Sequence, residues 1–167
     1  MLASTSKTRN GRKALVDISH QVELIKKLRE LGTSLDVPFV INARVDVFLL
    51  ASGDPESRLA HAVQRANAYR KAGADCTYPI GRFELAVIAD LVTMIEGPVN
   101  ILGGPPGPTI PELAKAGVAR VSFGGRMMSS VLGHLRGIAF EILEHGTYTK
   151  MKAETLSGAE FGALFSN

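Results

Sequence analysis

The sequence predicts an α/β fold in which helices cover a parallel sheet, and three observations support this. Short apolar runs alternate with helical patterns along most of the 167 residues. The share of hydrophobic residues, 46%, is enough for one sizeable core. The order is one helix followed by four strand–helix units, which is typical of parallel sheets. This order fits a doubly wound sheet or part of a (β/α)8 barrel, and a complete barrel needs at least about 200 residues.

The first helix is expected over residues 17–31. Apolar residues recur there at three-residue spacing from Val22 to Leu31, which gives the helix one buried face, and Gly32 ends the pattern. The continuous apolar run 37–43 follows, and such a run is typical of a buried parallel strand.

A second helix begins after Asp54, which serves as the N-cap ahead of a proline and of Glu56 in the first turn. This helix ends at Gly73. Residues 74–79 are predicted to form the next strand, and the apolar spacing within 83–95 predicts a third helix.

A third strand is expected over 99–102. Thr109 and Glu112 have the spacing of a capping box, so a short helix should run from Thr109 to Gly117. The apolar run 118–123 then predicts the fourth strand.

A long amphipathic helix is expected over 126–145. The domain organisation that follows is a basic loop or partly disordered start over 1–16, an α/β domain over 17–145 and a loosely attached tail over 146–167. The helix is marked by one apolar stripe: Met128, Val131, Leu135, Ile138 and Ile142.

Charge is concentrated at the start of the chain. Residues 1–30 hold seven basic and three acidic residues, a net +4, whereas the remainder holds 12 and 13, a net −1. No aromatic residue interrupts the basic stretch to stack on bases, and no apolar run has the roughly 18 residues of a membrane span. We therefore expect neither a nucleic acid nor a membrane as partner. The single cysteine excludes a disulfide framework and fits a reducing compartment, so the expected location is the cytoplasm.

Arg44 is the leading candidate for a substrate-binding residue. It emerges from an apolar strand, near the carboxyl edge where parallel α/β folds bind ligands. A guanidinium there is costly unless it is paired, and its fork suits a carboxylate or a phosphate. The alternative is an internal ion pair with Asp46 or a neighbouring loop. Asp46 is a supporting candidate, which orients Arg44 or holds a metal-bound water, and Asn42 lies on the same strand.

Two glycine pairs follow the last two strands. Gly103 and Gly104 come after one strand, and Gly124 and Gly125 after the other. Backbone amides of such loops can approach an anion closely, as in the phosphate sites of barrels, although plain turn geometry explains the glycines equally well. Asn100, at a strand end, is a candidate for hydrogen bonding to a substrate carboxylate.

No metal site is expected within this chain. The four histidines fall on predicted helices without the spacing of metal ligands, and only one carboxylate is visible beside Arg44. Cys76 lies in a predicted buried strand and is interpreted as a packing residue.

Several stretches resemble one enzyme family. Residues 39–48 (FVINARVDVF) are similar to the end of the fifth barrel strand of the isocitrate lyase/phosphoenolpyruvate mutase superfamily, which carries an ARTD-type motif. Residues 65–75 (RANAYRKAGAD) resemble the helix-to-strand turn of that family. Residues 97–100 (GPVN) and 111–122 (PELAKAGVARVS) resemble its seventh strand, the following helix and its eighth strand. The likeness extends from about residue 11 to about residue 150.

The resemblance implies a Mg²⁺-dependent barrel enzyme that breaks or rearranges a C–C or C–P bond in small 2-oxo or 2-hydroxy acids and their phosphonate analogues. Arg44 would be the substrate-binding arginine and Asn100 a contact of the substrate carboxylate. Helix 126–145 resembles the one that members of the family exchange between subunits.

The family's metal-binding residues lie on barrel strands one to four, which have no counterpart in this sequence. We therefore expect the carboxyl-terminal half, about four βα units, of a (β/α)8 TIM-type barrel whose Mg²⁺ ligands are not in this chain. The KKCGH loop of the lyase branch is absent from 8–16, and Ile80 or Gly81 replaces that branch's glutamate. These departures place the sequence nearer a short, uncharacterised subgroup than isocitrate lyase itself.

Three functions remain open. One is an incomplete lyase or mutase that acts with a partner half-barrel or is a truncation of a longer chain. The second is a non-catalytic half-barrel that binds anions and forms homo-oligomers, since exposed strand edges favour association. The third, which rests on the two glycine pairs alone, is a barrel fragment that binds phosphate-sugars. The sequence decides neither the substrate nor the oligomeric state.

Overall fold

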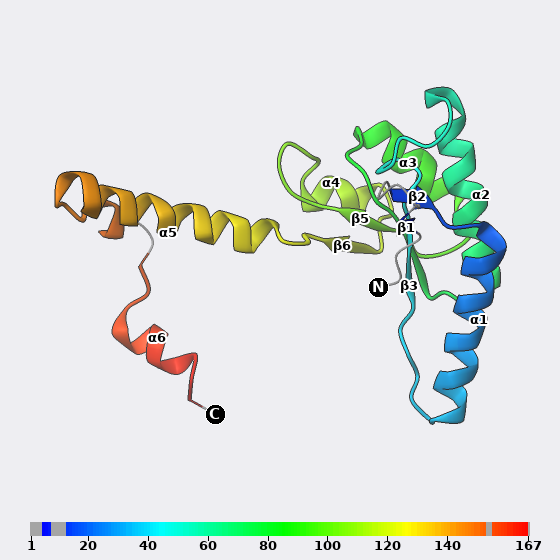
Figure 1. Ribbon diagram of the computed structural model, residues 1–167, viewed down its shortest axis with the longest axis horizontal. Coiled ribbons are helices and arrows are strands. Elements are labelled where there is room, and N and C mark those ends of the chain that lie inside the picture. Colours follow the sequence, from blue (N-terminus) through cyan, green and yellow to red (C-terminus); the bar gives the residue numbers. More distant parts are fainter. Residues whose placement is uncertain (1–4, 8–12, 153–154, 167) are drawn as a thin grey trace. The chain divides into compact units, whose positions relative to one another are not determined.

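Strands and helices alternate along the first part of the molecule (Figure 1). The computed structural model describes residues 5–7, 13–152 and 155–166, and the chain divides into two compact units, Met1–Phe123 and Gly124–Asn167. The strands of the first unit are β3 (Asn42–Val45), β4 (Cys76–Pro79), β5 (Asn100–Leu102) and β6 (Arg120–Ser122).

Pairing joins each of these strands to the next one in the sequence. β3 pairs with β4 in the register Arg44–Tyr78, and β5 pairs with β6 in the register Asn100–Arg120, both parallel. A parallel bridge between Thr77 and Val99 connects β4 to β5. Sequential parallel order is that of consecutive βα units in a barrel, whereas a doubly wound sheet reverses its order at a switch point.

The helices of this unit share one core on one face of the strands. They are α1 (Ile18–Ser34), a 3-10 turn η1 (Pro55–Ser57), α2 (Arg58–Lys71), α3 (Leu85–Met94) and α4 (Ile110–Lys115). Side chains of all four α-helices and of alternate strand residues make up that core: Ile25, Ala43, Val45, Tyr69, Ile88, Leu91, Val99, Ile101 and Leu113. Because side chains alternate along a strand, Asn42 and Arg44 lie on the opposite face.

The first helix is longer than the pattern predicts, and the first strand is shorter. α1 continues past Gly32, where a Cβ would lie 2.8 Å from the carbonyl oxygen of Val37. This glycine therefore allows a close approach of the returning chain and does not end the helix. The expected strand 37–43 begins only at Asn42, because side chains satisfy the backbone before it: Arg29 donates to the Phe39 carbonyl and Asp75 accepts from the Ile41 amide.

The capping box predicted at Thr109 is present. The Thr109 hydroxyl accepts from the Glu112 amide, while the Glu112 carboxylate accepts from the Thr109 amide at 2.8 Å. At the start of the chain, which was expected to be a loop, β1 (Thr5–Lys7) and β2 (Lys13–Leu15) form an antiparallel pair. The remainder of 1–12 lies outside the described residues.

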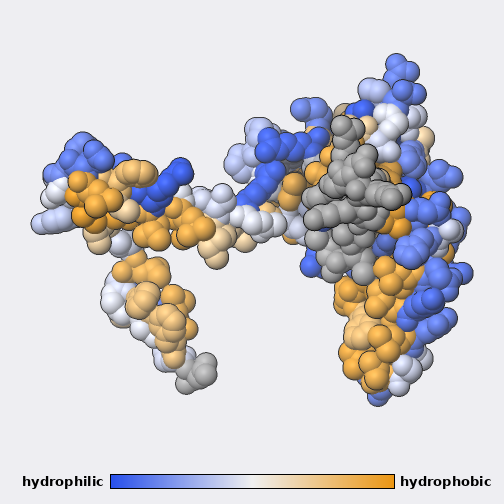
Figure 2. Space-filling view, in the orientation of Figure 1, coloured by the Kyte–Doolittle hydropathy of each residue, from blue (hydrophilic) through white to orange (hydrophobic). Residues whose placement is uncertain are grey.

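The second unit consists of α5 (Arg126–His145), a 3-10 turn η2 (Thr149–Lys152) and α6 (Gly158–Ala163). The long helix predicted over 126–145 has the same bounds in the structure. Most of its apolar stripe is exposed, with Val131 at 63% and Leu135 at 57% (Figure 2).

Glu141 anchors the turn that follows α5. Its side chain accepts hydrogen bonds from the amides of Thr149 and Lys150 and from the hydroxyls of Thr147 and Thr149. These donors, the Thr149 hydroxyl first, lower the pKa of Glu141 from 4.5 to about 2. The ionised carboxylate is therefore the form that holds η2 against the helix.

We expect this turn to be held above pH 4.5 and to loosen as the pH falls toward 2, because a lowered pKa stabilises only the ionised state. Amide NMR signals of Thr149 and Lys150 should report a titration in that range. Glu141→Gln should loosen the turn at neutral pH, whereas Glu144→Gln, which changes an exposed carboxylate of the same helix, should not. A turn that keeps its amide shifts in Glu141→Gln would contradict the anchoring role.

Candidate active site

Arg44 and Asp46 form a two-point ion pair at the carboxyl end of β3. The guanidinium Nε donates to Asp46 Oδ1 at 2.6 Å, and Nη2 donates to Oδ2 at 3.1 Å. The Arg44 side chain is 18% exposed and that of Asp46 is fully buried. The internal ion pair considered as the alternative for Arg44 is therefore present, and it orients the guanidinium.

This pair leaves part of the arginine fork available. Within the described part of the chain, no residue accepts a hydrogen bond from Nη1 of Arg44. A guanidinium whose Nε edge is held by a carboxylate still presents the N–H groups of its far edge to a second anion. The geometry thus permits Arg44 to be held by Asp46 and to bind a ligand at the same time.

The register of the strands places side chains of β4 and β5 in a row with Arg44 across the sheet. Arg44 lies beside Tyr78, and the Thr77–Val99 bridge places Tyr78 beside Asn100 on the same face. Tyr78 was not singled out from the sequence. Its place follows only from the parallel register between β3 and β4, which residue patterns do not reveal.

Asn100 is fully buried and only partly satisfied. Its Nδ2 donates to the hydroxyl of Ser122 at 2.9 Å, which places Ser122 in the site as a residue that the sequence analysis did not select. Its Oδ1 receives no hydrogen bond from the described residues, and the same holds for Oδ1 of Asn42 on β3. An unmet buried amide oxygen costs about 1–3 kcal/mol, so both positions suit a donor supplied by a ligand or by a further structural element.

The glycines after β5 have separate structural reasons. The amide of Gly103 donates to the Ser122 carbonyl at 3.0 Å, and a Cβ on Gly103 would lie 2.5 Å from Cγ1 of Val121. Gly104 has φ +111°, a conformation that favours glycine. Gly103 is thus required by packing, and Gly104 by its turn.

Gly124 and Gly125 open the second unit. Gly124 has φ +55°, whereas Gly125 is the N-cap of α5 with no atom within 4 Å of a Cβ built on it. Only Gly125 of the two pairs therefore lacks a steric or conformational explanation among the described residues.

Cys76 and His61 have structural roles. Cys76 is buried, and burial raises its pKa, which disfavours the thiolate. His61 accepts a hydrogen bond from Nε of Arg65 at 3.1 Å, and burial followed by the Arg65 charge lowers the pKa of His61. It is thus held as a neutral acceptor.

Nowhere in 5–7, 13–152 and 155–166 do three His, Cys, Asp or Glu side chains come together as metal ligands. In the same ranges, no helix is long and apolar enough to cross a bilayer.

Comparison with known proteins defines the family. The family model of phosphoenolpyruvate phosphomutase matches residues 4–143. The chain belongs to the phosphoenolpyruvate mutase/isocitrate lyase superfamily. No curated protein matches it.

Solved structures of this superfamily share the fold. A protein of Burkholderia cenocepacia J2315 assigned as a lyase/mutase is 31% identical with a TM-score of 0.79, and the match covers 92% of this chain and 54% of that one. A protein of the same organism assigned as a phosphonomutase is 33% identical with a TM-score of 0.70, covering 75% and 51%. A phosphonopyruvate hydrolase solved with oxalate and Mg²⁺ is 24% identical with a TM-score of 0.68, covering 90% and 52%. The chain therefore spans about half the length of these superfamily members.

Matched glycine substitutions test the packing explanation of the β5 loop. Gly103→Ala should lower the free energy of unfolding by about 1–3 kcal/mol, because its methyl group overlaps Val121. Gly125→Ala should stay within about 0.5 kcal/mol, since nothing lies near its Cβ position. Urea unfolding followed by circular dichroism measures both values. Equal stability of the two variants would show that packing against Val121 does not require a glycine at position 103.

Proposed function

We propose that this chain is the carboxyl-terminal half of a Mg²⁺-dependent lyase or mutase. The reaction is cleavage or rearrangement of a C–C or C–P bond in a small 2-oxo or 2-hydroxy acid. The family match over 4–143, the coverage of about half of each solved relative and the sequential parallel strands support the assignment to half of a barrel. The single cysteine, Cys76, is buried and free, which is consistent with the cytoplasm as the proposed location.

The observation that carries the proposal is the orientation of Arg44. Asp46 fixes the guanidinium through Nε and Nη2, and the Nη1 edge remains for a substrate carboxylate or phosphonate. In this scheme Arg44 is the catalytic residue that touches substrate, Asp46 positions it, and Asn42 supports the same strand. Asn100 contacts the substrate through its unsatisfied Oδ1.

The loop amides have a smaller role in the scheme. After β5, Gly104 offers its backbone N–H to an anionic group, while Gly103 donates its own amide to the Ser122 carbonyl and shapes that loop. Taken by itself, the turn before α5 offers the backbone N–H groups of Gly124 and Gly125. Any Mg²⁺ would be held by residues outside the described ones, and its chemistry there would be to offset developing negative charge.

The proposed partner is a second half-barrel or a further copy of this chain. No described strand pairs with the outer edges of β3 and β6, and open edges recruit additional strands. The exposed stripe of α5 supports exchange of this helix between subunits, because a continuous apolar stripe on a helix is normally covered by another element or subunit.

A non-catalytic half-barrel that binds anions and forms oligomers is the second candidate. The open edges and the α5 stripe favour it equally, and it uses Arg44 in the same way. The two candidates differ when the chain is combined with an amino-terminal half from a superfamily member. The isolated chain should show no Mg²⁺-dependent turnover of oxaloacetate, isocitrate-type acids or phosphonopyruvate. If the chain is half of an enzyme, the combination should show such turnover; if the chain is non-catalytic, the combination should remain inactive.

Oxalate binding tests the role of Arg44 directly. Calorimetric titration of the chain with oxalate should give saturable binding that Arg44→Lys weakens at least ten-fold, because lysine lacks the planar fork that holds Asp46 on one edge and offers a bidentate contact to a second carboxylate on the other. Lys27→Ala, which removes an exposed cation from α1, should bind like the parent chain. Unchanged affinity in Arg44→Lys would refute the assignment of the anion site.

A further inference from the structure

Successive helices of the first unit are joined by a contact that repeats. A side chain near the end of one helix lies over the residue of positive φ that follows the next helix. In the first case Arg29 of α1 covers Gly73, which has φ +107° and follows α2. A Cβ on Gly73 would lie 3.5 Å from Nε of Arg29, and that Nε donates to the Gly73 carbonyl at 3.1 Å.

The second and third junctions repeat this arrangement. Arg70 of α2 covers Gly97, which has φ +115° and follows α3; its Nε would lie 2.6 Å from a Cβ there and donates to the Glu96 carbonyl at 2.9 Å. At the third junction Val92 of α3 covers Gly117, whose φ is +85°, with 3.1 Å between Cγ1 and a Cβ built on the glycine. In each case the helix earlier in the chain supplies the covering side chain.

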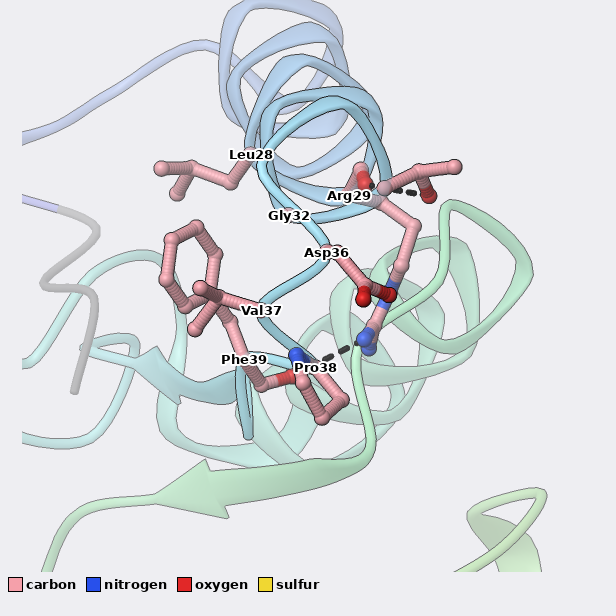
Figure 3. Close-up of a pocket in the computed structure, with 8 residues that line it drawn as sticks. Leu28, Arg29, Gly32, Asp36, Val37, Pro38 and Phe39 are labelled. Carbon is pink, nitrogen blue, oxygen red and sulfur yellow. Dashed lines mark hydrogen bonds between the residues drawn. The ribbon is translucent and has the colours of Figure 1, made fainter.

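The first turn of the series has no such cover. The residue of positive φ after α1 is Asp36, with φ +52°. A surface pocket of about 340 Å³ lies there, and it is lined by Leu28, Arg29, Gly32, Thr33, Asp36, Val37, Pro38 and Phe39 (Figure 3). In the described part of the chain no residue pairs with the Asp36 carboxylate.

The chemistry of this pocket specifies a cation. Asp36 places a carboxylate where the other turns have glycine, so the side chain that covers it meets a negative charge. The other charge in the pocket, Arg29, is already neutralised by Asp75, with Nη2 and Oδ2 2.6 Å apart. Two of the three equivalent covering side chains in this chain are arginines, and backbone carbonyls accept their remaining N–H groups.

An exposed apolar face of α1, suitable for packing against another helix, lies beside the pocket. Leu24, Leu31 and Leu35 share a face of α1 with Leu28 of the pocket wall and are 37%, 45% and 57% exposed. Figure 2 shows this apolar surface at the end of α1 and the adjoining loop. Within the first unit, consecutive helices also pack side by side: α1 contacts α2, and α2 contacts α3.

We propose that the Asp36 pocket binds an arginine side chain from a helix that packs on the leucine face of α1. The helix belongs to the amino-terminal half-barrel, so this part of the inference rests on the proposed function. The contact would be the fourth member of the series and would fix the register between the two halves. Arg29 and Arg70 of a second copy would not supply it, because both are used in their own turns.

The pocket can be tested in the chain as it exists. N-acetyl-arginine amide is titrated into ¹⁵N-labelled protein, and N-acetyl-citrulline amide serves as the neutral probe of the same shape. The arginine probe should shift the amides of Thr33, Asp36 and Val37 saturably, and the citrulline probe should bind at least five-fold more weakly. Asp36→Asn should weaken the arginine probe to the same extent, because asparagine keeps the left-handed backbone and removes the charge. Asp54→Asn, an exposed helix N-cap without a side-chain cap bond, should leave binding unchanged.

The outcome is separable from that of the anion site. Arg44→Lys should leave the arginine probe unaffected, and Asp36→Asn should leave oxalate binding unaffected. Equal binding of the two probes, or an unchanged response in Asp36→Asn, would overturn the pocket assignment even if Arg44 binds oxalate. Failure of oxalate binding with a retained arginine site would instead reject the proposed function alone.

Discussion

The two-point ion pair between Arg44 and Asp46 is the constraint on which the site depends. An apolar strand carries a guanidinium to its carboxyl end, and an unpaired charge there would be costly to desolvate. A fully buried carboxylate two residues later removes that cost and fixes the direction of the fork. Such pairs add little net stability, but loss of one partner typically costs about 3–5 kcal/mol. Their value here is orientation.

The rest of the first unit holds this pair in place. The helices bury alternate residues of β3 on one face of the strand, so Arg44 lies on the other face. The parallel register then brings Tyr78 and Asn100 alongside, and the hydrogen bond from Asn100 to Ser122 extends the row to the last strand. On this face the buried side-chain oxygens of Asn42 and Asn100 accept no hydrogen bond from the described residues.

Much of the architecture could be predicted from local pattern. The capping box at Thr109 and the bounds of the long helix follow from residue spacing. Both features depend only on neighbouring residues of the same segment, so the rest of the fold does not alter them. The boundary errors have tertiary causes. The sequence pattern predicts a helix end at Gly32, whereas in the structure this glycine allows the Val37 carbonyl to come close. The backbone before Asn42 forms hydrogen bonds with Arg29 and Asp75 from other elements.

Only part of the candidate site could be predicted from the sequence. Arg44 and Asp46 could be found because a charge in an apolar run is conspicuous. Tyr78 and Ser122 could not, since their roles depend on strand register and on a partner 22 residues away. The repeated cover of positive-φ turns, which assigns the Asp36 pocket, is likewise a property of helix packing that no spacing reveals.

The most direct test of the account is the ¹⁵N–¹H spectrum of the Arg44 guanidinium with and without oxalate. The account predicts that oxalate shifts the Nη1 hydrogens and slows their exchange, while the Nε signal stays where Asp46 holds it. A guanidinium whose Nη1 signals do not respond to oxalate would show that Arg44 serves only its internal pair, and the proposed chemistry would then have no anchor in this chain.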